Sequence, residues 1–272
     1  MSKIISAIAL TGFAFAMPAV AFADTNISAA GSTALQPLVT AAAQEYQAKH
    51  PGTNISVTGG GSKTGLSLVA SKAVDLGDSD ILAPADAKDL VDHKVAVIGF
   101  SVVVNPASGV TSLTKKQIQD IFSGKTTNFK DVGGKDQAIT VINRPASSGT
   151  RAVFVKTVMG DADLSKATLT EDATGTVVQK VIQSPGAISY ASFSGTHNKS
   201  GIVEVKIDGA SPDEMTVESG KYPFWSYEHI YTNGQPSAAV DDFIKFVADD
   251  GDLMKKTGYI LVKDMKVSET NR

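Results

Sequence analysis

The chain has 272 residues, no cysteine and a formal charge of −3, so no disulfide stabilises it and its charge balance is weakly acidic. A weakly acidic protein lacks the positive surface field that nucleic acids and anionic membranes attract, so we expect neither as a partner. A chain of this length can bury a complete hydrophobic core, as one large domain or as two small ones.

The N-terminus has the pattern of a secretory signal peptide. Lys3 is followed by an apolar run over residues 4–17, and the tripeptide A-F-A that ends at Ala23 is a small-x-small cleavage motif. The apolar run is shorter than the roughly 20 residues of a membrane-spanning helix, which makes a transmembrane anchor the weaker interpretation. We therefore expect cleavage after Ala23 and a mature protein, residues 24–272, without stable membrane insertion.

Short apolar runs alternate with helical patterns along the mature chain, which is typical of an α/β protein. Its first part predicts strands over residues 26–29, 54–58 and 74–77 and helices over residues 33–49 and 64–71. Further along, a helix is expected over residues 114–122, where Thr114 and Gln117 have capping-box spacing. The other expected elements are a strand over 139–143, helices over 148–159 and 177–182, strands over 187–190 and 202–207, a long helix around 240–247 and a final strand over 259–262.

Two apolar stretches are candidates for strands that cross between two lobes. Residues 95–105 form a run longer than most strands, and residues 222–231 form an aromatic, extended stretch. Two crossings imply a discontinuous first lobe, residues 24–101 and 230–272, and a second lobe, residues 102–229. Ligands often bind in the cleft between two such lobes.

Four polar turns that contain glycine carry the candidate chemistry. They are AGSTA at residues 30–34, GGGSKTG at 59–65, GDSD at 77–80 and RPASSGTR at 144–151. Three of them place Ser or Thr where a helix should begin, and there the backbone N–H groups lack intrahelical partners and the helix dipole is positive. Such ends bind anions, and glycine allows a close approach. Each turn alone fits an ordinary helix cap better than an anion site, but together with Asp80 and Arg144 they favour a tetrahedral oxyanion.

In their order along the chain, these turns resemble the substrate-binding protein of the phosphate-specific ABC transporter. AAGSTALQPL resembles that family's first phosphate turn, TGGGSKTG the second, VDLGDSDI the turn with the acidic ligand, and NRPASSGTR the arginine-x3-Ser-Gly-Thr loop. The resemblance covers nearly the whole mature chain. It implies a type II periplasmic-binding-protein fold, in which two α/β lobes are joined by two crossing strands and hold the ligand in the cleft.

The resemblance also implies a function and a set of ligand residues. The protein would bind inorganic phosphate with high affinity in the periplasm and deliver it to an inner-membrane ABC permease. Carried over by position, the phosphate contacts would be Ser32, Thr33, Ala34, Ser62, Asp80, Arg144, Ser148, Gly149 and Thr150. Arg144 would make the one charged donation and Ala34 would donate its amide. Position 34 is alanine where some members of the family have an aromatic residue, so packing over the anion is expected to differ.

Asp80 gives the expected site its selectivity. Like charges repel, so a carboxylate beside an anion makes sense only if the ligand keeps a proton to donate. Phosphate keeps one at neutral pH and sulfate does not, so an acceptor at Asp80 favours phosphate. The main alternative is a binding protein for another tetrahedral oxyanion, and among these arsenate stays open.

A second alternative is a periplasmic serine acyl-enzyme of the penicillin-recognising type. Residues 112–115 match S-x-x-K and residues 256–258 match K-T-G, but the expected S-D-N motif is missing. A P-loop is not supported either, because Gln119 occupies the position of its leading glycine. The four histidines are too scattered for a metal site. We therefore expect a monomer that is not an enzyme and that needs neither a metal nor a cofactor.

Overall fold

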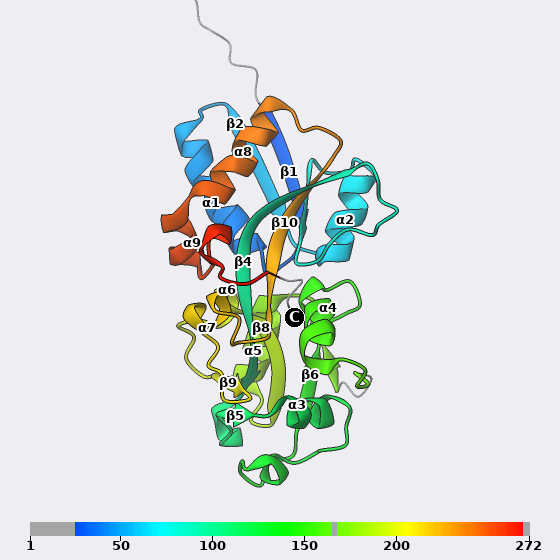
Figure 1. Cartoon of the computed structure of the whole chain (residues 1–272), viewed down its shortest axis with the longest axis vertical. Helices are drawn as coiled ribbons and strands as arrows, with labels where there is room; N and C mark the ends of the chain where they lie inside the picture. Colours follow the sequence, from blue (N-terminus) through cyan, green and yellow to red (C-terminus); the bar gives the residue numbers. More distant parts are fainter. Residues whose placement is uncertain (1–24, 165–167, 269–272) are drawn as a thin grey trace, which may run out of the picture.

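A computed structural model describes residues 25–164 and 168–268, so the predicted signal peptide and its cleavage site lie outside the described residues. The described part forms two α/β lobes, one above the other along the long axis of the molecule. Strands β4 (Leu90–Val104) and β10 (Trp225–Asn233) pass through the junction between them (Figure 1). Within this part of the chain, no helix combines the length and the hydrophobicity that a membrane crossing requires.

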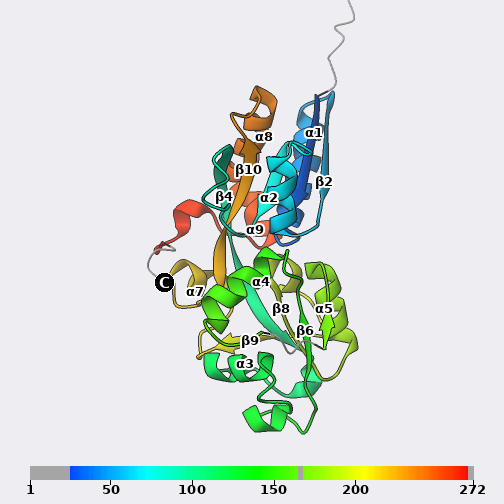
Figure 2. The ribbon, with the colours of Figure 1, turned by 90° about the vertical axis from the view of Figure 1, so that its right-hand side faces the viewer.

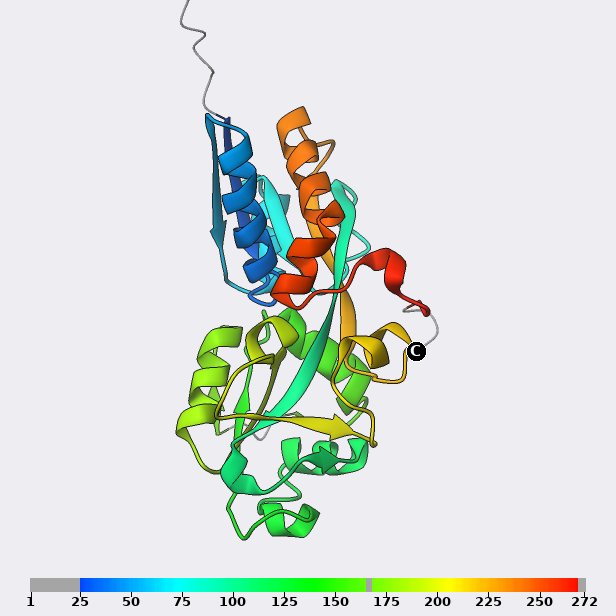
Figure 3. The ribbon, with the colours of Figure 1, turned by 90° about the vertical axis from the view of Figure 1, so that its left-hand side faces the viewer.

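The first lobe contains a sheet with the strand order β2-β1-β3-β10-β4. Strands β1 (Thr25–Gly31), β2 (Thr53–Thr58) and β3 (Leu76–Ser79) are parallel, and β10 runs antiparallel to both β3 and β4. Helices α1 (Gln36–Lys49), α8 (Ala238–Asp249) and α9 (Gly251–Thr257) lie on one side of the sheet (Figure 3), and α2 (Ser62–Ala70) lies on the other (Figure 2). Because β1 and β3 are parallel, their carboxyl ends meet at the edge that faces the second lobe.

The second lobe continues from the lower part of β4. It adds β8 (Ala187–Ser192), β6 (Thr140–Asn143) and β7 (Leu169–Thr170) in that order, while β9 (Val203–Ile207) pairs with β4 and with β5 (Ser112–Leu113). Helices α4 (Gly149–Phe154) and α5 (Thr174–Gln183) lie on opposite sides of β6 and β8 (Figure 2). The other helical segments are α3 (Lys115–Phe122), α6 (Phe193–Thr196), α7 (Glu214–Glu218), a π-helix (Val155–Met159) and 3₁₀ turns at Pro106–Ser108, Phe129–Val132 and Val262–Asp264.

Strand β4 changes its pairing partner where it passes between the lobes. Its residues up to Gly99 pair with β10, and its residues from Phe100 onward pair with β8. A Cβ atom at Gly99 would lie 2.1 Å from the Phe193 ring, so only glycine fits at this crossing. The Phe100 amide donates to the Phe224 carbonyl at 2.9 Å, which ties the two crossing strands together.

An aromatic cluster supports α4 from below the junction. Phe154 of α4 stacks on Tyr190 of β8 at a ring-centroid distance of 4.1 Å, and Phe100 stacks on Phe224 at 5.0 Å. Phe122 packs edge-on against Phe154, and all five rings are fully buried. Because aromatic contacts of this kind are rigid and bury much surface, they fix the C-terminal end of α4 relative to the crossing strands.

Most of the predicted elements are present, with ends that differ by a few residues. The capping box is confirmed: the Gln117 amide donates to Thr114 Oγ1 at 3.1 Å, and the Thr114 amide donates to Gln117 Oε1 at 2.8 Å. Helix α1 begins at Gln36 rather than at residue 33, because Ser32 Oγ accepts the amides of residues 34 and 35 in a preceding turn.

The secondary structure differs from the prediction in three places. The final strand over residues 259–262 is a single antiparallel bridge between Val97 and Ile260, after which the backbone turns into a 3₁₀ segment. Helix α9 was not predicted, although Asp250 caps it by accepting the Leu253 amide at 2.9 Å. The helix expected over residues 148–159 is α-helical only as far as Phe154 and then widens into the π-helix.

Candidate functional site

Asp80 lies at the centre of a polar network between the two lobes. It directly follows β3 and is 3% exposed. Its carboxylate accepts the Ser32 hydroxyl on Oδ1 and the Thr150 hydroxyl on Oδ2, the latter at 2.9 Å. Its backbone amide donates to Ser62 Oγ at 3.0 Å. Asp80 therefore joins the turns after β1 and β2 of the first lobe to the start of α4 in the second.

Arg144 supplies a buried positive charge to the same network. It follows β6 and is 1% exposed. Its Nη2 donates to Thr33 Oγ1 at 3.1 Å and to the Asp172 carbonyl at 2.8 Å, while its Nε and Nη1 have no hydrogen-bond partner among the described residues. Burial lowers the pKa of Arg144, and the nearby Tyr190, Asp80 and Asp172 oppose that shift. A buried guanidinium with two unused donors is suited to binding an anion.

Thr174 is a residue of this network that the sequence analysis missed. It begins α5, and its amide donates to Thr33 Oγ1 at 3.3 Å, with the two hydroxyl oxygens 3.5 Å apart. Thr33 thus contacts two segments of the second lobe. The signal was present in the sequence, because residues 173–176 (ATGT) form another glycine-containing, hydroxyl-rich helix start.

Two glycines allow the lobes to touch through their backbones. A Cβ atom at Gly149 would lie 2.1 Å from Ser62 Oγ and 2.9 Å from Asp80 Cβ, so the start of α4 packs directly on the first lobe. Gly61 has a φ of +91°, and a Cβ atom there would lie 2.8 Å from the Ser147 carbonyl oxygen. The Lys63 amide donates to that same oxygen at 3.1 Å. The cleft is therefore closed in this structure.

The structure thus brings most of the predicted ligand residues into one contact network: Ser32, Thr33, Ser62, Asp80, Arg144, Gly149 and Thr150. The other two lie beside it and make helix-end contacts. Ser148 Oγ accepts the Arg151 amide at 3.2 Å and caps α4, and the Ala34 amide donates to Ser32 Oγ at 3.0 Å. Arg151 Nη1 donates to the Arg144 carbonyl at 3.0 Å, so it supports the backbone of Arg144.

Burial controls the charge of the acidic groups at the site. It raises the pKa of Asp80, while the Ser32 and Thr150 hydroxyls and the Arg144 charge act in the opposite direction. Two further acids, Asp78 and Glu228, are fully buried nearby, and burial raises the pKa of each well above its ordinary value. The site therefore contains one carboxylate that hydroxyl donors stabilise and two that favour the neutral form.

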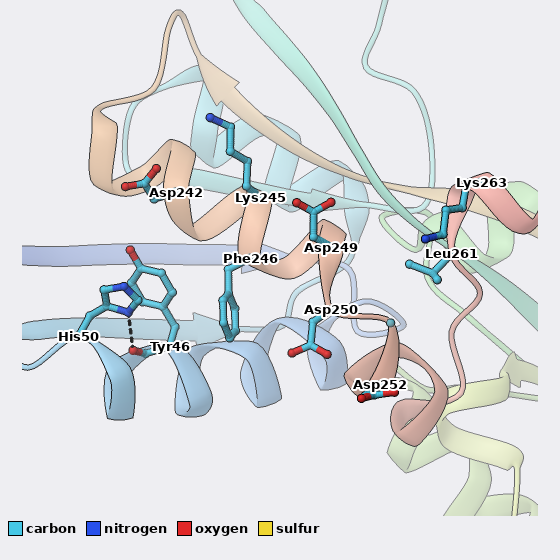
Figure 4. Close-up of a pocket in the computed structure, with 11 residues that line it drawn as sticks. Tyr46, His50, Asp242, Lys245, Phe246, Asp249, Asp250, Asp252, Leu261 and Lys263 are labelled. Carbon is cyan, nitrogen blue, oxygen red and sulfur yellow. Dashed lines mark hydrogen bonds between the residues drawn. The ribbon is translucent and has the colours of Figure 1, made fainter.

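Other parts of the described chain are less suited to an anion. A groove of about 760 Å³ lies between α1, α8 and α9, with Tyr46, Phe246 and four aspartates on its walls (Figure 4). Of its two lysines, Lys245 already pairs with Asp241 at 2.6 Å, so negative charge dominates this groove. No group of His, Asp and Glu side chains among the described residues could hold a metal ion.

The structure gives no support to the acyl-enzyme alternative. The S-x-x-K match begins at Ser112 in β5, and the K-T-G match begins at Lys256 in α9. These two elements lie in different lobes, with β5 near the far end of the second lobe (Figure 1). A penicillin-recognising site needs both motifs around one serine, and the fold keeps them apart.

Comparisons with known proteins agree with this geometry. Residues 16–251 match the family described as PBP superfamily domain. The chain is 43% identical to the phosphate-binding protein PstS of Bacillus subtilis (strain 168) over 255 residues, which are 90% of this chain and 84% of that protein. It is 28% identical to the phosphate-binding protein PstS of Staphylococcus epidermidis, over 85% of this chain and 77% of that protein.

Two solved structures share the fold along nearly their whole length. One is a putative phosphate ABC transporter substrate-binding protein with bound phosphate from Clostridium perfringens, with a TM-score of 0.82, 27% identity and coverage of 88% of this chain and 100% of that one. The other is an ABC-type phosphate transport receptor from Vibrio cholerae, with a TM-score of 0.70, 27% identity and coverage of 86% and 99%. These matches confirm the predicted fold. The chain belongs to the PBP superfamily and, within it, to the family of the Bacillus subtilis phosphate-binding protein.

Proposed function

We propose that this protein binds inorganic phosphate in the periplasm and delivers it to an inner-membrane ABC permease. The observation that carries the proposal is Arg144, a fully buried cation with two unused donors in a network of hydroxyl groups beside Asp80. The relatives support it, since the Bacillus subtilis protein is named as a phosphate-binding protein and the Clostridium perfringens structure contains bound phosphate.

The proposed phosphate shell consists of Ser32, Thr33, Ala34, Ser62, Asp80, Arg144, Ser148, Gly149 and Thr150. In it, Arg144 Nε and Nη1 donate to phosphate oxygens. The Ser32 and Thr150 hydroxyls donate to Asp80, so the hydroxyls of Thr33, Ser62 and Ser148 and the helix-start amides complete the donor set. Hydrogen bonds to a charged acceptor contribute roughly 1.5–3 kcal/mol each. Several of them are enough for micromolar or tighter binding, about −8 kcal/mol, after the costs of association.

Asp80 is an acceptor in this shell, unlike the donors above. It accepts a hydrogen bond from a ligand that still carries a proton. Its carboxylate already accepts the Ser32 and Thr150 hydroxyls, which favours the charged form. Sulfate has no proton to donate and would meet the repelling oxygens of Asp80 directly. Arsenate keeps a proton as phosphate does, and we expect the site to accept it.

The lobes are proposed to be residues 24–101 with 230–272, and residues 102–229. Both boundaries fall in the crossing strands, and the one between residues 101 and 102 lies near the point where β4 changes its partner. A ligand that contacts both lobes favours their closed arrangement, because its affinity for that arrangement is higher. We propose that the permease recognises the closed form of a monomer. The protein has no enzymatic role in this scheme, and its signal peptide is removed after Ala23.

Calorimetric titration of the phosphate-stripped mature protein tests the proposal. Phosphate should bind with a Kd of about 1 μM or lower, arsenate should bind comparably, and sulfate should bind at least about 100-fold more weakly. The Arg144→Met variant, titrated in parallel, separates binding at this site from binding elsewhere. Absence of phosphate binding by the parent protein, or equal affinities for phosphate and sulfate, would contradict the proposed function.

A further inference from the structure

Two buried carboxyl groups next to Asp80 have no part in the proposed phosphate shell. Asp78 and Glu228 are both fully buried, and within the described chain no N–H or hydroxyl group donates to either of them. Burying an ionised carboxylate without donors is very costly, so both side chains favour the neutral acid. A neutral acid differs from a carboxylate because it can donate a hydrogen bond.

Strand register brings Glu228 to Asp80. In the antiparallel pairing of β10 with β3, His229 lies opposite Ser79, so the next position places Glu228 opposite Asp80. Side chains at opposite positions of such a pair point to the same face of the sheet. Ser226, two residues before Glu228 and therefore on that face, donates its hydroxyl to the Asp80 carbonyl at 2.6 Å. Glu228 and Asp80 therefore lie within reach of each other, and the charge of Asp80 raises the pKa of Glu228 beyond the effect of burial.

The surroundings decide which partner of this pair holds the proton. Burial raises the pKa of Glu228 first, and the charges of Asp80 and Asp78 raise it further. For Asp80 the effect of burial is opposed by two hydroxyl donors and by Arg144. Tyr259 also interacts with both carboxyl groups, and it stays neutral because burial raises its pKa. Glu228 is therefore the donor and Asp80 the charged acceptor.

We propose that Glu228 is a positioning residue for anion selectivity: its neutral carboxyl donates a hydrogen bond to Asp80 and keeps Asp80 an acceptor for a protonated oxyanion. This inference rests on the proposed function, although Glu228 itself does not touch the ligand. Without that donor, Asp80 takes up a proton more readily. A neutral Asp80 can donate to sulfate, so loss of Glu228 should move selectivity from phosphate toward sulfate.

Titration of three variants with phosphate and sulfate tests this role. Glu228→Met removes the donor at similar volume and should lower the ratio of phosphate to sulfate affinity by at least about tenfold. Glu228→Gln should restore the ratio to within about threefold of the parent, because its amide still donates to Asp80. Ile230→Ala is the matched control, because it removes a buried side chain from the same face of β10. It should lower the melting temperature and leave the ratio unchanged.

An infrared measurement on the ligand-free protein separates this inference from the proposed function. At neutral pH the carbonyl band of protonated carboxylic acids should be weaker in Glu228→Gln than in the parent, because only Asp78 then remains as a neutral acid. If that band is the same in both proteins, or if Glu228→Met keeps the parent's selectivity, the inference is wrong while phosphate binding by the parent still stands. A parent that binds no phosphate overturns both proposals.

Discussion

Replacing Arg144 by methionine should abolish tight phosphate binding without unfolding the protein. Methionine retains most of the aliphatic length but removes Nε and Nη1, the two donors that have no protein partner. Two hydrogen bonds to a charged acceptor are worth about 3–6 kcal/mol together. That loss corresponds to a ~10²–10⁴-fold higher Kd, since each 1.4 kcal/mol changes affinity about tenfold.

The stability of the ligand-free protein should respond differently. Replacing a buried charge by an apolar side chain of similar size is often neutral or stabilising, because the desolvation cost of the charge disappears. Urea unfolding without phosphate should therefore give a similar or higher free energy for Arg144→Met. With phosphate at about 1,000 times the parent's Kd, the parent should gain about 4 kcal/mol and the variant much less.

Calorimetry and urea unfolding with Arg144→Lys as a companion variant complete this test. Lysine keeps the charge but offers one compact ammonium instead of a planar fork, so its affinity should fall between those of the parent and Arg144→Met. A phosphate Kd for Arg144→Met within twofold of the parent's would refute the assignment of Arg144 to the site. A lower affinity accompanied by a large loss of ligand-free stability would show that the charge is structural.

Three further predictions follow from the same geometry. Asp80→Asn should lower the ratio of phosphate affinity to sulfate affinity by at least about tenfold, because its amide can donate to sulfate. An unchanged ratio in calorimetry would contradict this. Gly149→Ala should weaken phosphate binding more than tenfold, since its Cβ would lie 2.1 Å from Ser62 Oγ and hold the lobes apart. Identical phosphate titration curves for variant and parent would show that the lobes adjust freely. Glu228→Gln should raise the free energy of unfolding at pH 8. Above pH ~4.3, the ordinary pKa of glutamate, this free energy should fall less steeply with pH in the variant than in the parent. The sign follows because the folded parent keeps a proton on Glu228 that the unfolded chain releases; parallel urea-unfolding profiles from pH 5 to 8 would contradict it.

The sequence predicted the turns of the site better than their mutual contacts. Ser, Thr and Gly between a strand and a helix are visible as a local pattern, which is why the turns at Ser32, Ser62 and Thr150 stood out. Glu228 could not be found in this way, because it lies in an aromatic stretch typical of a buried strand. It reaches Asp80 only through the antiparallel register of β10 with β3.

The fold class was predictable because the alternation of strands and helices is a strong pattern. Element ends were less predictable, since tertiary contacts decide them. Helix α1 begins late because Ser32 holds the preceding amides, and the apolar run at residues 259–262 makes one bridge to Val97 before it turns away. Thr174 was not predicted because it joins the site only through the tertiary contact of the start of α5 with Thr33.

The position of β10 has a consequence for how the chain reaches its native state. This strand is inserted between β3 and β4 in the first lobe, although its residues follow almost the whole second lobe in the sequence. Until residues 225–233 are available, β3 and β4 lack the strand that joins them, so a growing or truncated chain cannot complete its N-terminal sheet. Pairing between such distant segments slows folding. The topology therefore postpones the compact state of the first lobe until nearly the entire polypeptide has been made.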